Sequence, residues 1–590
     1  MHLKNIITYS TLNIPRRTLS ISHYTLNISH YTLHIMEIKI DNFIKIYEKS
    51  FIENWDLPAL SNYVTGKTMT YGDLAQYIAM IHLFYKSSGV KKGAKIALCG
   101  KDSPEWVMVY MATITYGAVI VPILSEFNPV DITHIVNHSG ADLLFVSGSI
   151  WEQMEPEKLL KVKGVLRMEN WELLYEKRGE ELSRNQRLLK RRFRRQYPKG
   201  YTSEDVHYAE RSNSEVAEIN YTSGTTGFSK GVMLTGENLA GNVCFGRDTQ
   251  LHFRSSRALS FLPLAHAYGC AFDMLTPLAV GSHVTLLGKT PSPRILLKAL
   301  QEVKPNLVIC VPLILEKIYK NQILPMLTKG SVRWTLAVPL LDNFIYSKIR
   351  KKLVDAFGGE FEEVIVGGAP LNHEVEDFLH KIKFPFTVGY GMTECGPLIS
   401  YTPWREFIPG SSGRTLPTME SKILSEDPEN IPGEICVKGT NVMKGYYKNP
   451  DATAQVFDKD GWLKSGDMGT RSADGTLFLR GRSKTMILSA SGQNIYPEEI
   501  EAKLNNMPFV AESLVVERDG KLVALVYPDY DALDRFDVSV HDMDPTLEKM
   551  RTELNKLVAP YERIAKIVLM PNEFEKTPKR SIKRFLYTAK

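Results

Sequence analysis

A short loop rich in glycine and hydroxyl side chains constrains the fold of this chain more than any other feature. Its sequence is Tyr221-Thr-Ser-Gly-Thr-Thr-Gly-Phe-Ser-Lys-Gly231, and the apolar residues within 216–219 before it favour a β-strand. The glycines allow turns that other residues resist, so amide N–H groups can converge on an anion beside hydroxyl donors and the charge of Lys230. No Ser or Thr follows the lysine, so the run is not a Walker A loop. A flexible loop is the alternative on composition alone, and we favour a phosphate-binding loop.

The length of the chain predicts more than one domain, because 590 residues exceed what one hydrophobic core supports. With 44% hydrophobic and 23% charged residues, the composition is that of an ordinary globular protein. No apolar run reaches the about 18 residues of a membrane-spanning helix. The net charge of +6 is too small to indicate a nucleic-acid partner. The six cysteines form no CxxC pair, which predicts reduced thiols in a cytoplasmic protein.

Residues 1–35 differ from the remainder of the chain. The heptapeptide ISHYTLN at 21–27 recurs as ISHYTLH at 28–34. The repeat lacks the charge pairs of a coiled coil, and no apolar core ends in the small-residue cleavage site of a signal peptide. We interpret this stretch as a non-native or disordered leader and predict that the protein proper starts at Met36.

Helical and strand patterns alternate along most of the chain. Periodicity predicts helices over 71–87 and 106–116, and strands over 95–98, 119–123 and 143–146. The alternation resumes after the loop, which predicts an α/β fold with parallel sheets. Short strands between glycine turns over 410–481 predict a small β-rich subdomain, and the residues from about 483 onward have the size of a small α+β domain.

A dense basic run occupies residues 184–199. A solvated helix or surface loop is the simplest interpretation. The alternative is a peripheral contact with the inner face of a membrane, because basic side chains near anionic lipid contribute on the order of 1 kcal/mol each. The apolar residues in the run are too few for a deeply inserted amphipathic anchor.

Three further segments carry side chains suited to a nucleotide. Gly367-Gly-Ala-Pro370 follows a predicted strand, and its small residues let a flat heterocycle lie against the backbone. Tyr390-Gly-Met-Thr-Glu394 offers an aromatic face, a hydroxyl and a carboxylate able to hold Mg²⁺. Ser465-Gly-Asp467 supplies a carboxylate that can accept two hydrogen bonds from the vicinal hydroxyls of a ribose. Each segment alone is more often a turn or a solvated loop.

Together and in this order, the segments resemble the adenylate-forming superfamily of acyl-CoA synthetases, luciferases and adenylation domains, over nearly the whole chain from Met36. The resemblance implies a large N-terminal α/β domain over 36–481 and a small mobile C-terminal domain over 482–590, hinged near Lys484. It implies catalytic roles for Lys230 and Glu394, and a Mg²⁺ ion held by Glu394 and Thr226. It implies nucleotide binding by Thr222, Ser223, Gly224, Thr225, Thr226, Gly227, Gly368, Ala369, Pro370, Tyr390, Gly391, Met392, Thr393, Asp467 and Arg482.

The same resemblance gives two more groups a role. His266, within Phe261-Leu-Pro-Leu-Ala-His-Ala-Tyr-Gly269, matches a histidine near the carboxylate of the acyl substrate, and a merely packed histidine is the alternative. Gly492 lies in a stretch that resembles the loop facing the CoA tunnel.

The segment Thr577-Pro-Lys-Arg-Ser-Ile-Lys-Arg584 departs from the family pattern. Relatives commonly carry a lysine at the place of Ser581, and that lysine reaches the α-phosphate and the carboxylate during adenylation. In an extended segment, Lys579 and Lys583 point to the same side as Ser581, displaced by about 6 to 7 Å. We predict that one of these catalytic candidates supports a slow adenylation step, and a solvated C-terminal tail is the alternative.

The resemblance therefore predicts an ATP-dependent fatty acid–CoA ligase that works through an acyl-AMP intermediate, with ATP, Mg²⁺ and CoA as cofactors and a fatty acid as substrate. Fatty acids are favoured because the small apolar residues over 267–272 offer room for a tail. An acyl–acyl carrier protein synthetase is one alternative, and a nucleotide- or acyl-binding protein without turnover is the other. The acyl chain length, the thiol acceptor and the oligomeric state stay open.

Overall fold

The computed structural model describes residues 37–177, 179–222, 230–289, 291–327, 341–488, 493–535, 538–539, 543–577 and 581–588. The chain divides into two units, Met1–Glu37 and Ile38–Lys590, and the helices and strands of the described residues lie in the second. Its mixed α/β architecture confirms the predicted fold class. Among the described residues, no helix combines the length and the apolar character needed to cross a membrane.

An eight-stranded sheet contains the strand that leads into the glycine-rich loop. Its strand order is β20-β9-β8-β4-β3-β5-β6-β7. Pairing is parallel from β8 through β6 and antiparallel at the edges. The strands are β3 (Lys95–Cys99), β4 (Val119–Ile123), β5 (Leu143–Val146), β6 (Gly164–Arg167), β7 (Leu173–Glu176), β8 (Val216–Thr222), β9 (Lys230–Thr235) and β20 (Gly445–Tyr446).

A seven-stranded sheet has the order β14-β13-β12-β10-β11-β1-β2, parallel except at β1 and β2. Strands β12 and β13 are buried along their whole length, as expected where helices cover both faces of a parallel sheet. The strands are β1 (Pro58–Asn62), β2 (Thr68–Thr70), β10 (Arg257–Ser260), β11 (His283–Leu286), β12 (Leu307–Cys310), β13 (Glu363–Val366) and β14 (Phe386–Val388).

The helices of this region follow local signals in the sequence. Helix α4 starts after Ser103, whose side chain accepts a hydrogen bond from the Trp106 amide, and ends at Gly117 with a φ of 84°. The helices are α2 (Phe43–Glu53), α3 (Tyr71–Ser87), α4 (Pro104–Tyr116), α5 (Pro129–Ser139), α6 (Gly148–Trp151), α7 (Glu181–Gln196), α8 (Gly236–Asp248), α9 (Ala267–Gly269), α10 (Thr276–Val280), α11 (Pro293–Val303), α12 (Pro312–Ile318), α13 (Leu324–Leu327), α15 (Leu341–Ala356) and α16 (His373–Lys381).

The predicted β-rich subdomain is present. A four-stranded antiparallel sheet has the order β18-β19-β21-β22, and a smaller sheet joins β15, β16 and β17. The strands are β15 (Tyr390–Gly391), β16 (Leu398–Tyr401), β17 (Arg414–Thr415), β18 (Met419–Leu424), β19 (Gly433–Gly439), β21 (Leu463–Arg471) and β22 (Leu477–Arg482), and the helix α17 spans Pro450–Val456.

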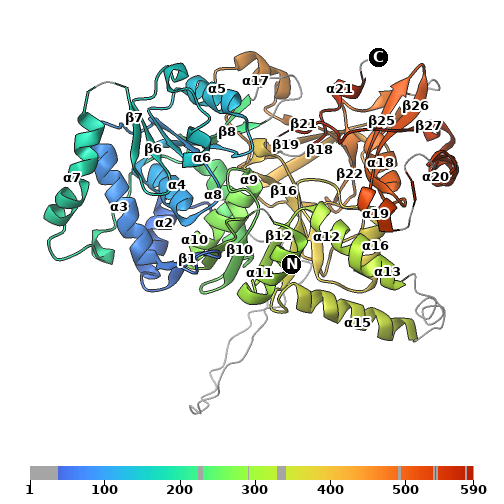
Figure 1. Ribbon diagram of the computed structural model, residues 1–590, viewed down its shortest axis with the longest axis horizontal. Helices are drawn as coiled ribbons and strands as arrows, with labels where there is room; N and C mark the ends of the chain where they lie inside the picture. The colour runs from blue at the N-terminus through green and yellow to red at the C-terminus, as the bar shows by residue number, and fades with distance from the viewer. Residues whose placement is uncertain are drawn as a thin grey trace, which may run out of the picture. The chain divides into compact units, whose positions relative to one another are not determined.

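The C-terminal residues form an α+β region with a core of its own. Figure 1 shows α18 and α20 beside the sheet of β25, β26 and β27. Leu504, Val515, Ala524, Leu554 and Ile564 are among the side chains of that core, which come from helices and strands alike. The elements are β23 (Ile487–Leu488), β24 (Asn494–Ile495), α18 (Pro497–Asn505), β25 (Val510–Arg518), β26 (Lys521–Pro528), α19 (Tyr530–Arg535), α20 (Asp544–Leu557), β27 (Ile564–Leu569) and α21 (Phe585–Thr588).

Candidate active site

One cleft of about 3000 Å³ gathers most of the residues that the sequence singled out. They come from the ends of strands in both large sheets, from the β-rich subdomain and from the C-terminal region. The predicted residues that line it are Thr222, Lys230, His266, Gly368, Ala369, Pro370, Tyr390, Gly391, Met392, Thr393, Glu394, Asp467, Arg482, Lys484 and Lys583.

Seven predicted site residues lie outside the described residues. They are Ser223, Gly224, Thr225, Thr226, Gly227, Gly492 and Lys579. Of the loop that was predicted to bind phosphate, the structure describes the two ends, Thr222 on β8 and Lys230 on β9, which pair across the antiparallel ladder.

Tyr446 connects Lys230 and Glu394, two of the residues that the sequence assigned to catalysis. The ammonium of Lys230 lies 4.8 Å from the centre of the Tyr446 ring, within cation–π range. The Tyr446 hydroxyl donates a hydrogen bond to Oε1 of Glu394 at 2.9 Å. Burial and the neighbouring Glu394 carboxylate both raise the pKa of Tyr446. Sequence analysis missed this tyrosine because it lies on the short strand β20, far along the chain from Lys230.

Asp467 is held by two side chains in the same cleft. The Tyr390 hydroxyl donates to Oδ2 at 2.7 Å, and Nε of Arg482 pairs with Oδ1 at 2.8 Å. Asp467 and Arg482 face each other across the ladder of β21 and β22. Burial raises the pKa of Asp467, while Arg482 and Tyr390 act in the opposite direction. The carboxylate that was predicted to meet a ribose is therefore oriented by protein partners.

The turn after β13 opens toward the cleft. Gly368 has a φ of 87°, and residues 368–370 are exposed. Gly367 has no room for a side chain, because a Cβ there would lie 2.9 Å from the ring of Tyr268. The Tyr268 hydroxyl donates to the backbone oxygen of Ile365 at 3.0 Å, which fixes the ring against the end of the strand.

The segment that carries His266 is anchored by an aspartate that the sequence did not single out. Asp102 lies in the loop after β3, and its Oδ1 accepts a hydrogen bond from the Leu264 amide at 3.1 Å. Burial raises the pKa of Asp102 to about 7. His266 caps α9, with its Nδ1 3.4 Å from the Tyr268 amide nitrogen. A polar residue directly beyond the carboxyl end of a parallel strand was the available signal for Asp102.

The small residues after His266 are packed into the core. Cys270, Ala271 and Phe272 are each 2% exposed, in a π-helical turn over Cys270–Leu275. A Cβ on Gly269 would lie 2.8 Å from the backbone oxygen of Pro263. Tyr268 and Gly269 line the cleft, whereas Cys270, Ala271 and Phe272 are tightly packed, so room for a tail beside residues 267–272 stays a prediction.

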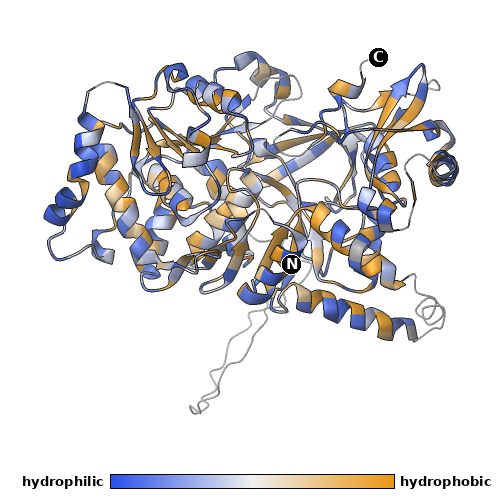
Figure 2. Cartoon of the chain, viewed as in Figure 1, coloured by the Kyte–Doolittle hydropathy of each residue, from blue (hydrophilic) through white to orange (hydrophobic). Residues whose placement is uncertain are grey.

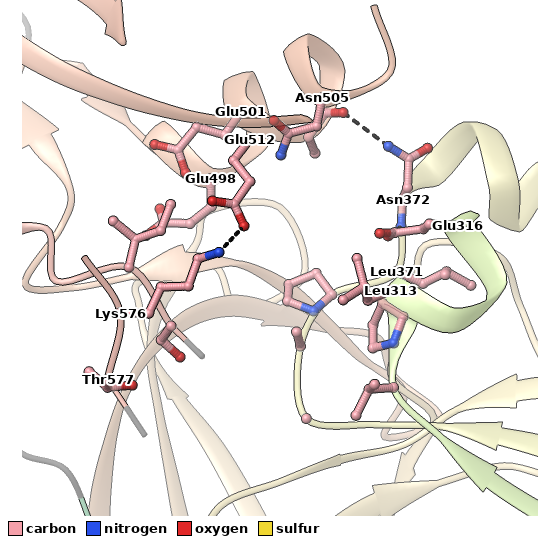
Figure 3. Close-up of a pocket in the computed structure, with 18 of the residues that line it drawn as sticks. Leu313, Glu316, Leu371, Asn372, Glu498, Glu501, Asn505, Glu512, Lys576 and Thr577 are labelled. Atoms are coloured by element: carbon pink, nitrogen blue, oxygen red, sulfur yellow. Dashed lines mark hydrogen bonds and ion pairs between the residues drawn. The ribbon is translucent and has the colours of Figure 1, made fainter. Parts of the chain in front are cut away.

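In the C-terminal segment, residues on either side of 578–580 pair with each other, and 578–580 themselves lie outside the described residues. The Thr577 amide donates to the Ser581 oxygen at 2.8 Å, and Lys576 pairs antiparallel with Ile582. Backbone pairing therefore folds the two flanks against each other. Nζ of Lys583 lies 3.5 Å from Oε2 of Glu575. Lys576, which the sequence did not single out, forms an ion pair with Glu512, with 2.6 Å between Nζ and Oε1 (Figure 3).

The cleft has walls of different character. Figure 3 shows Leu313 and Leu371 on one side and the carboxylates of Glu498, Glu501 and Glu512 on the other. Leu313 is 47% exposed although it is a large apolar residue, so it offers an apolar surface to a ligand.

Among the described residues, no group of three or more His, Cys, Asp or Glu side chains is placed to hold a metal ion. A single carboxylate such as Glu394 suits Mg²⁺, which keeps waters and takes its other oxygen ligands from phosphates.

The protein family model described as AMP-binding enzyme matches residues 49–447. The chain is 30% identical over 506 residues to the peroxisomal long chain acyl-CoA synthetase 6 of Arabidopsis thaliana, covering 79% of this chain and 69% of the relative. It is 28% identical over 572 residues to 4-coumarate–CoA ligase 1 of the same plant, covering 93% of each.

Solved structures share the fold. The ATP-bound crystal structure of MatB from Rhodopseudomonas palustris superposes with a TM-score of 0.71 at 21% identity, over 92% of this chain and 98% of that one.

Proposed function

The chain belongs to the AMP-binding enzyme family, and from this premise we propose that it is a ligase that activates a fatty acid with ATP and transfers the acyl group to CoA. The observation that carries the proposal is the single cleft in which Lys230, Glu394, Asp467 and Arg482 converge. The cations of Lys230 and Arg482 suit phosphates, the carboxylate of Glu394 suits a metal ion bound to phosphate, and the carboxylate of Asp467 suits the hydroxyls of a ribose.

In the proposed adenylation step, a carboxylate attacks the α-phosphorus of ATP and pyrophosphate leaves. Lys230 neutralises charge on the transferring phosphate, and Tyr446 holds the lysine near Glu394. Glu394 would hold Mg²⁺, which supplies further neutralisation of the phosphate charges when bound. Asp467 accepts hydrogen bonds from the ribose hydroxyls, with Arg482 beside the nucleotide. The protein thus acts by positioning and charge stabilisation, without a covalent nucleophile.

An apolar side chain in the cleft wall supports a substrate acid with an apolar tail or ring. Leu313 is exposed to the cleft, and Leu371 lies beside it (Figure 3). This surface suits an alkyl chain and also an aromatic acid, and the two named relatives are a long-chain synthetase and a 4-coumarate ligase. We favour the fatty acid because the chain has its higher identity with the long-chain synthetase.

Pyrophosphate release with a panel of acids tests the proposal. Saturated fatty acids of increasing length, 4-coumarate, benzoate and malonate are supplied with ATP and Mg²⁺, and pyrophosphate is followed with a coupled assay. Fatty acids are expected to give the highest kcat/KM. Asp467→Ala is expected to weaken ATP binding by about 10-fold or more, because a charged hydrogen-bond partner is lost. Activity with none of the acids contradicts the proposal.

A binding protein without turnover is the second candidate. It is favoured by Ser581, which lines the cleft at the place where relatives commonly carry a lysine. ATP and fatty acid that bind without any pyrophosphate release identify this candidate. If pyrophosphate is released instead, radiolabelled acyl groups offered to CoA and to an acyl carrier protein establish which thiol accepts them.

We also propose that residues 184–199 bring the enzyme to an anionic membrane, where a water-insoluble substrate is found. The basic side chains of α7 support this contact.

A further inference from the structure

A buried polar network joins the strand before the phosphate-binding loop to the segment that carries His266. Glu218 and Asn220 lie two residues apart on β8, so they project from the same face of the strand. They are 1% and 2% exposed. The neighbouring strand β4 is apolar along its buried length, which makes two polar side chains in this sheet unusual.

Both oxygens of the Glu218 carboxylate have partners. The Tyr110 hydroxyl on α4 donates to Oε2 at 2.6 Å, and Nδ2 of Asn220 donates to Oε1 at 2.8 Å. The same Nδ2 also donates to the backbone oxygen of Ala265 at 3.2 Å. Asn220 therefore links the strand to the residue directly before His266.

A carboxylate is a costly choice for this position, because an apolar side chain of similar volume often stabilises a core equally well. Burial raises the pKa of Glu218, and the hydrogen bonds from Tyr110 and Asn220 lower it. The network instead fixes how the joined elements lie relative to each other, because each hydrogen bond has a defined partner and a defined length.

We propose that Glu218 and Asn220 are positioning residues for the adenylation step, which hold the segment around Ala265 and His266 in register with the end of β8. The inference rests on the proposed function, in which the acyl carboxylate near His266 meets a phosphate held by the loop after β8. A displacement of about 1 Å between reacting groups costs on the order of 100-fold in rate. Asp102 ties the Leu264 amide to the loop after β3, so the segment is anchored at two points.

Asn220→Val tests the link, because valine suits a β-strand but donates no hydrogen bond to Ala265. We expect kcat for ATP–pyrophosphate exchange to fall about 10- to 100-fold, while KM for ATP changes less than about threefold. Thioester formation from supplied acyl-AMP is expected to change less than about threefold, because the α-phosphate is no longer attacked.

Two variants of the same network serve as controls. Tyr110→Phe removes one hydrogen bond to Glu218 and keeps the contact between Asn220 and Ala265, so exchange is expected to stay within about threefold despite a lower melting temperature. Glu218→Gln retains an acceptor for Asn220 and is expected to preserve exchange within about threefold. Glu218→Leu removes the acceptor that orients the Asn220 amide and is therefore expected to resemble Asn220→Val.

The inference is overturned if Asn220→Val exchanges as fast as the parent, or if Tyr110→Phe slows exchange as much as Asn220→Val does, since the network is then only structural. Equal losses in Glu218→Gln and Glu218→Leu also overturn it, because charge and not connection would matter. If the unmodified protein shows no exchange with any acid while it remains folded, the proposed function itself fails and the inference falls with it.

Discussion

Tyr446 shows how one residue can organise a site at a distance along the chain. Its ring faces Lys230 and its hydroxyl faces Glu394, so one side chain sets the relative positions of a cation and a carboxylate. The contact depends on the pairing of β20 with β9, in which Tyr446 lies opposite Val232.

Glu394→Gln is expected to raise the Mg²⁺ concentration needed for half-maximal adenylation by about 10-fold or more, because a neutral amide is a much weaker ligand for a hard cation. The amide oxygen still accepts the hydrogen bond from Tyr446, so the melting temperature is expected to change by less than about 2 °C. Titration of Mg²⁺ in the pyrophosphate assay measures the effect.

Glu434→Gln is the matched control, because Glu434 also lines the cleft and accepts a backbone hydrogen bond, from Gly466 at 3.1 Å. Its Mg²⁺ requirement is expected to stay that of the parent. A shift of equal size in both variants would assign the effect to the general charge of the cleft.

His252 makes stability depend on pH. Nε2 lies 2.9 Å from the Phe272 oxygen, Nδ1 has no partner among the described residues, and burial lowers the pKa of His252 from 6.5 to about 4. Because the folded-state pKa is depressed, the unfolded chain takes up the proton first as the pH falls. The contribution of neutral His252 to the free energy of unfolding is therefore complete above the unfolded-state pKa of 6.5 and is lost as the pH falls toward 4.

The free energy of unfolding of the parent falls as the pH is lowered from about 7 to about 4.5. In His252→Gln this fall is expected to be smaller by about 2 to 3 kcal/mol, because glutamine still donates to Phe272 and takes up no proton. Urea unfolding at the two pH values measures the difference. Parallel losses in both proteins would exclude His252 as the titrating group.

At the scale of the element, α7 separates its apolar and basic side chains. Leu182, Leu189 and Phe193 are buried, and the helix packs against α3. Figure 2 shows the helix to be largely hydrophilic. The outward basic residues are Arg184, Arg187, Lys190, Arg191, Arg194 and Arg195. With its apolar side chains used in packing, the helix can approach a membrane by charge alone.

Replacement of Lys190, Arg191, Arg194 and Arg195 with Gln is expected to weaken binding to phosphatidylserine vesicles by about 100-fold or more at low salt, at about 1 kcal/mol for each charge. Arg192 is left in place because it donates to Asn185 at 2.8 Å. Sedimentation with vesicles measures binding, and activity on soluble short acids is expected to be unchanged.

The exposed basic residues Lys348, Arg350, Lys351 and Lys352 on α15 provide the control when replaced with Gln. An equal loss of vesicle binding in the α7 and α15 variants would show that the net charge of the protein, and not α7 in particular, determines binding. If the parent does not bind the vesicles, the membrane proposal is wrong.

The described lysines of the C-terminal segment have different surroundings. Lys576 is held by Glu512 and Glu573, whereas Lys583 has a more distant partner in Glu575, whose side chain is 66% exposed. An exposed ion pair of this kind contributes little, so Lys583 is available to a substrate in the cleft.

Lys583→Ala, combined with Lys579→Ala, is expected to slow pre-steady-state acyl-AMP formation by about 10-fold or more, because a charge near the transferring phosphate is lost. Thioester formation from supplied acyl-AMP is expected to keep its rate. Lys576→Ala is the control with an engaged lysine. Adenylation at the parent rate in the double variant would show that neither lysine replaces the residue missing at Ser581.

At the scale of the whole molecule, polar side chains join the C-terminal region to helices beside the seven-stranded sheet. Asn372 caps α16 through Oδ1, which also accepts Nδ2 of Asn506 at 2.8 Å. Its own Nδ2 donates to the Ala502 oxygen at 3.0 Å, and Lys320 donates to the Val510 oxygen at 2.7 Å. We propose that these contacts hold one orientation of a C-terminal domain hinged near Lys484.

Asn506→Ala is expected to speed trypsin cleavage near Lys484 by about threefold or more, because the loss of a bond between the regions lowers the cost of local opening. Asn505→Ala is the matched control, since Asn505 accepts from Ser513 within the C-terminal region at 2.7 Å. Mass spectrometry of the fragments locates the cut. Equal cleavage rates in the two variants would remove Asn506 from the hinge.

The sequence alone determined the fold class, the helix over 71–87, strands such as 119–123 and the family that its motifs resemble. These rest on patterns of neighbouring residues, such as apolar periodicity and glycine turns, which act over a few residues of chain.

The tertiary structure decided which side chains meet. Tyr446 beside Lys230, Asp102 under the Leu264 amide and Asn220 against Ala265 depend on strand pairing and loop packing between residues far apart in the chain. The backbone hydrogen bond from Thr577 to Ser581 and the close packing of Gly269 against Pro263 also form only in the folded chain. Such contacts carry no local signal because their free energy exists only once the elements are assembled.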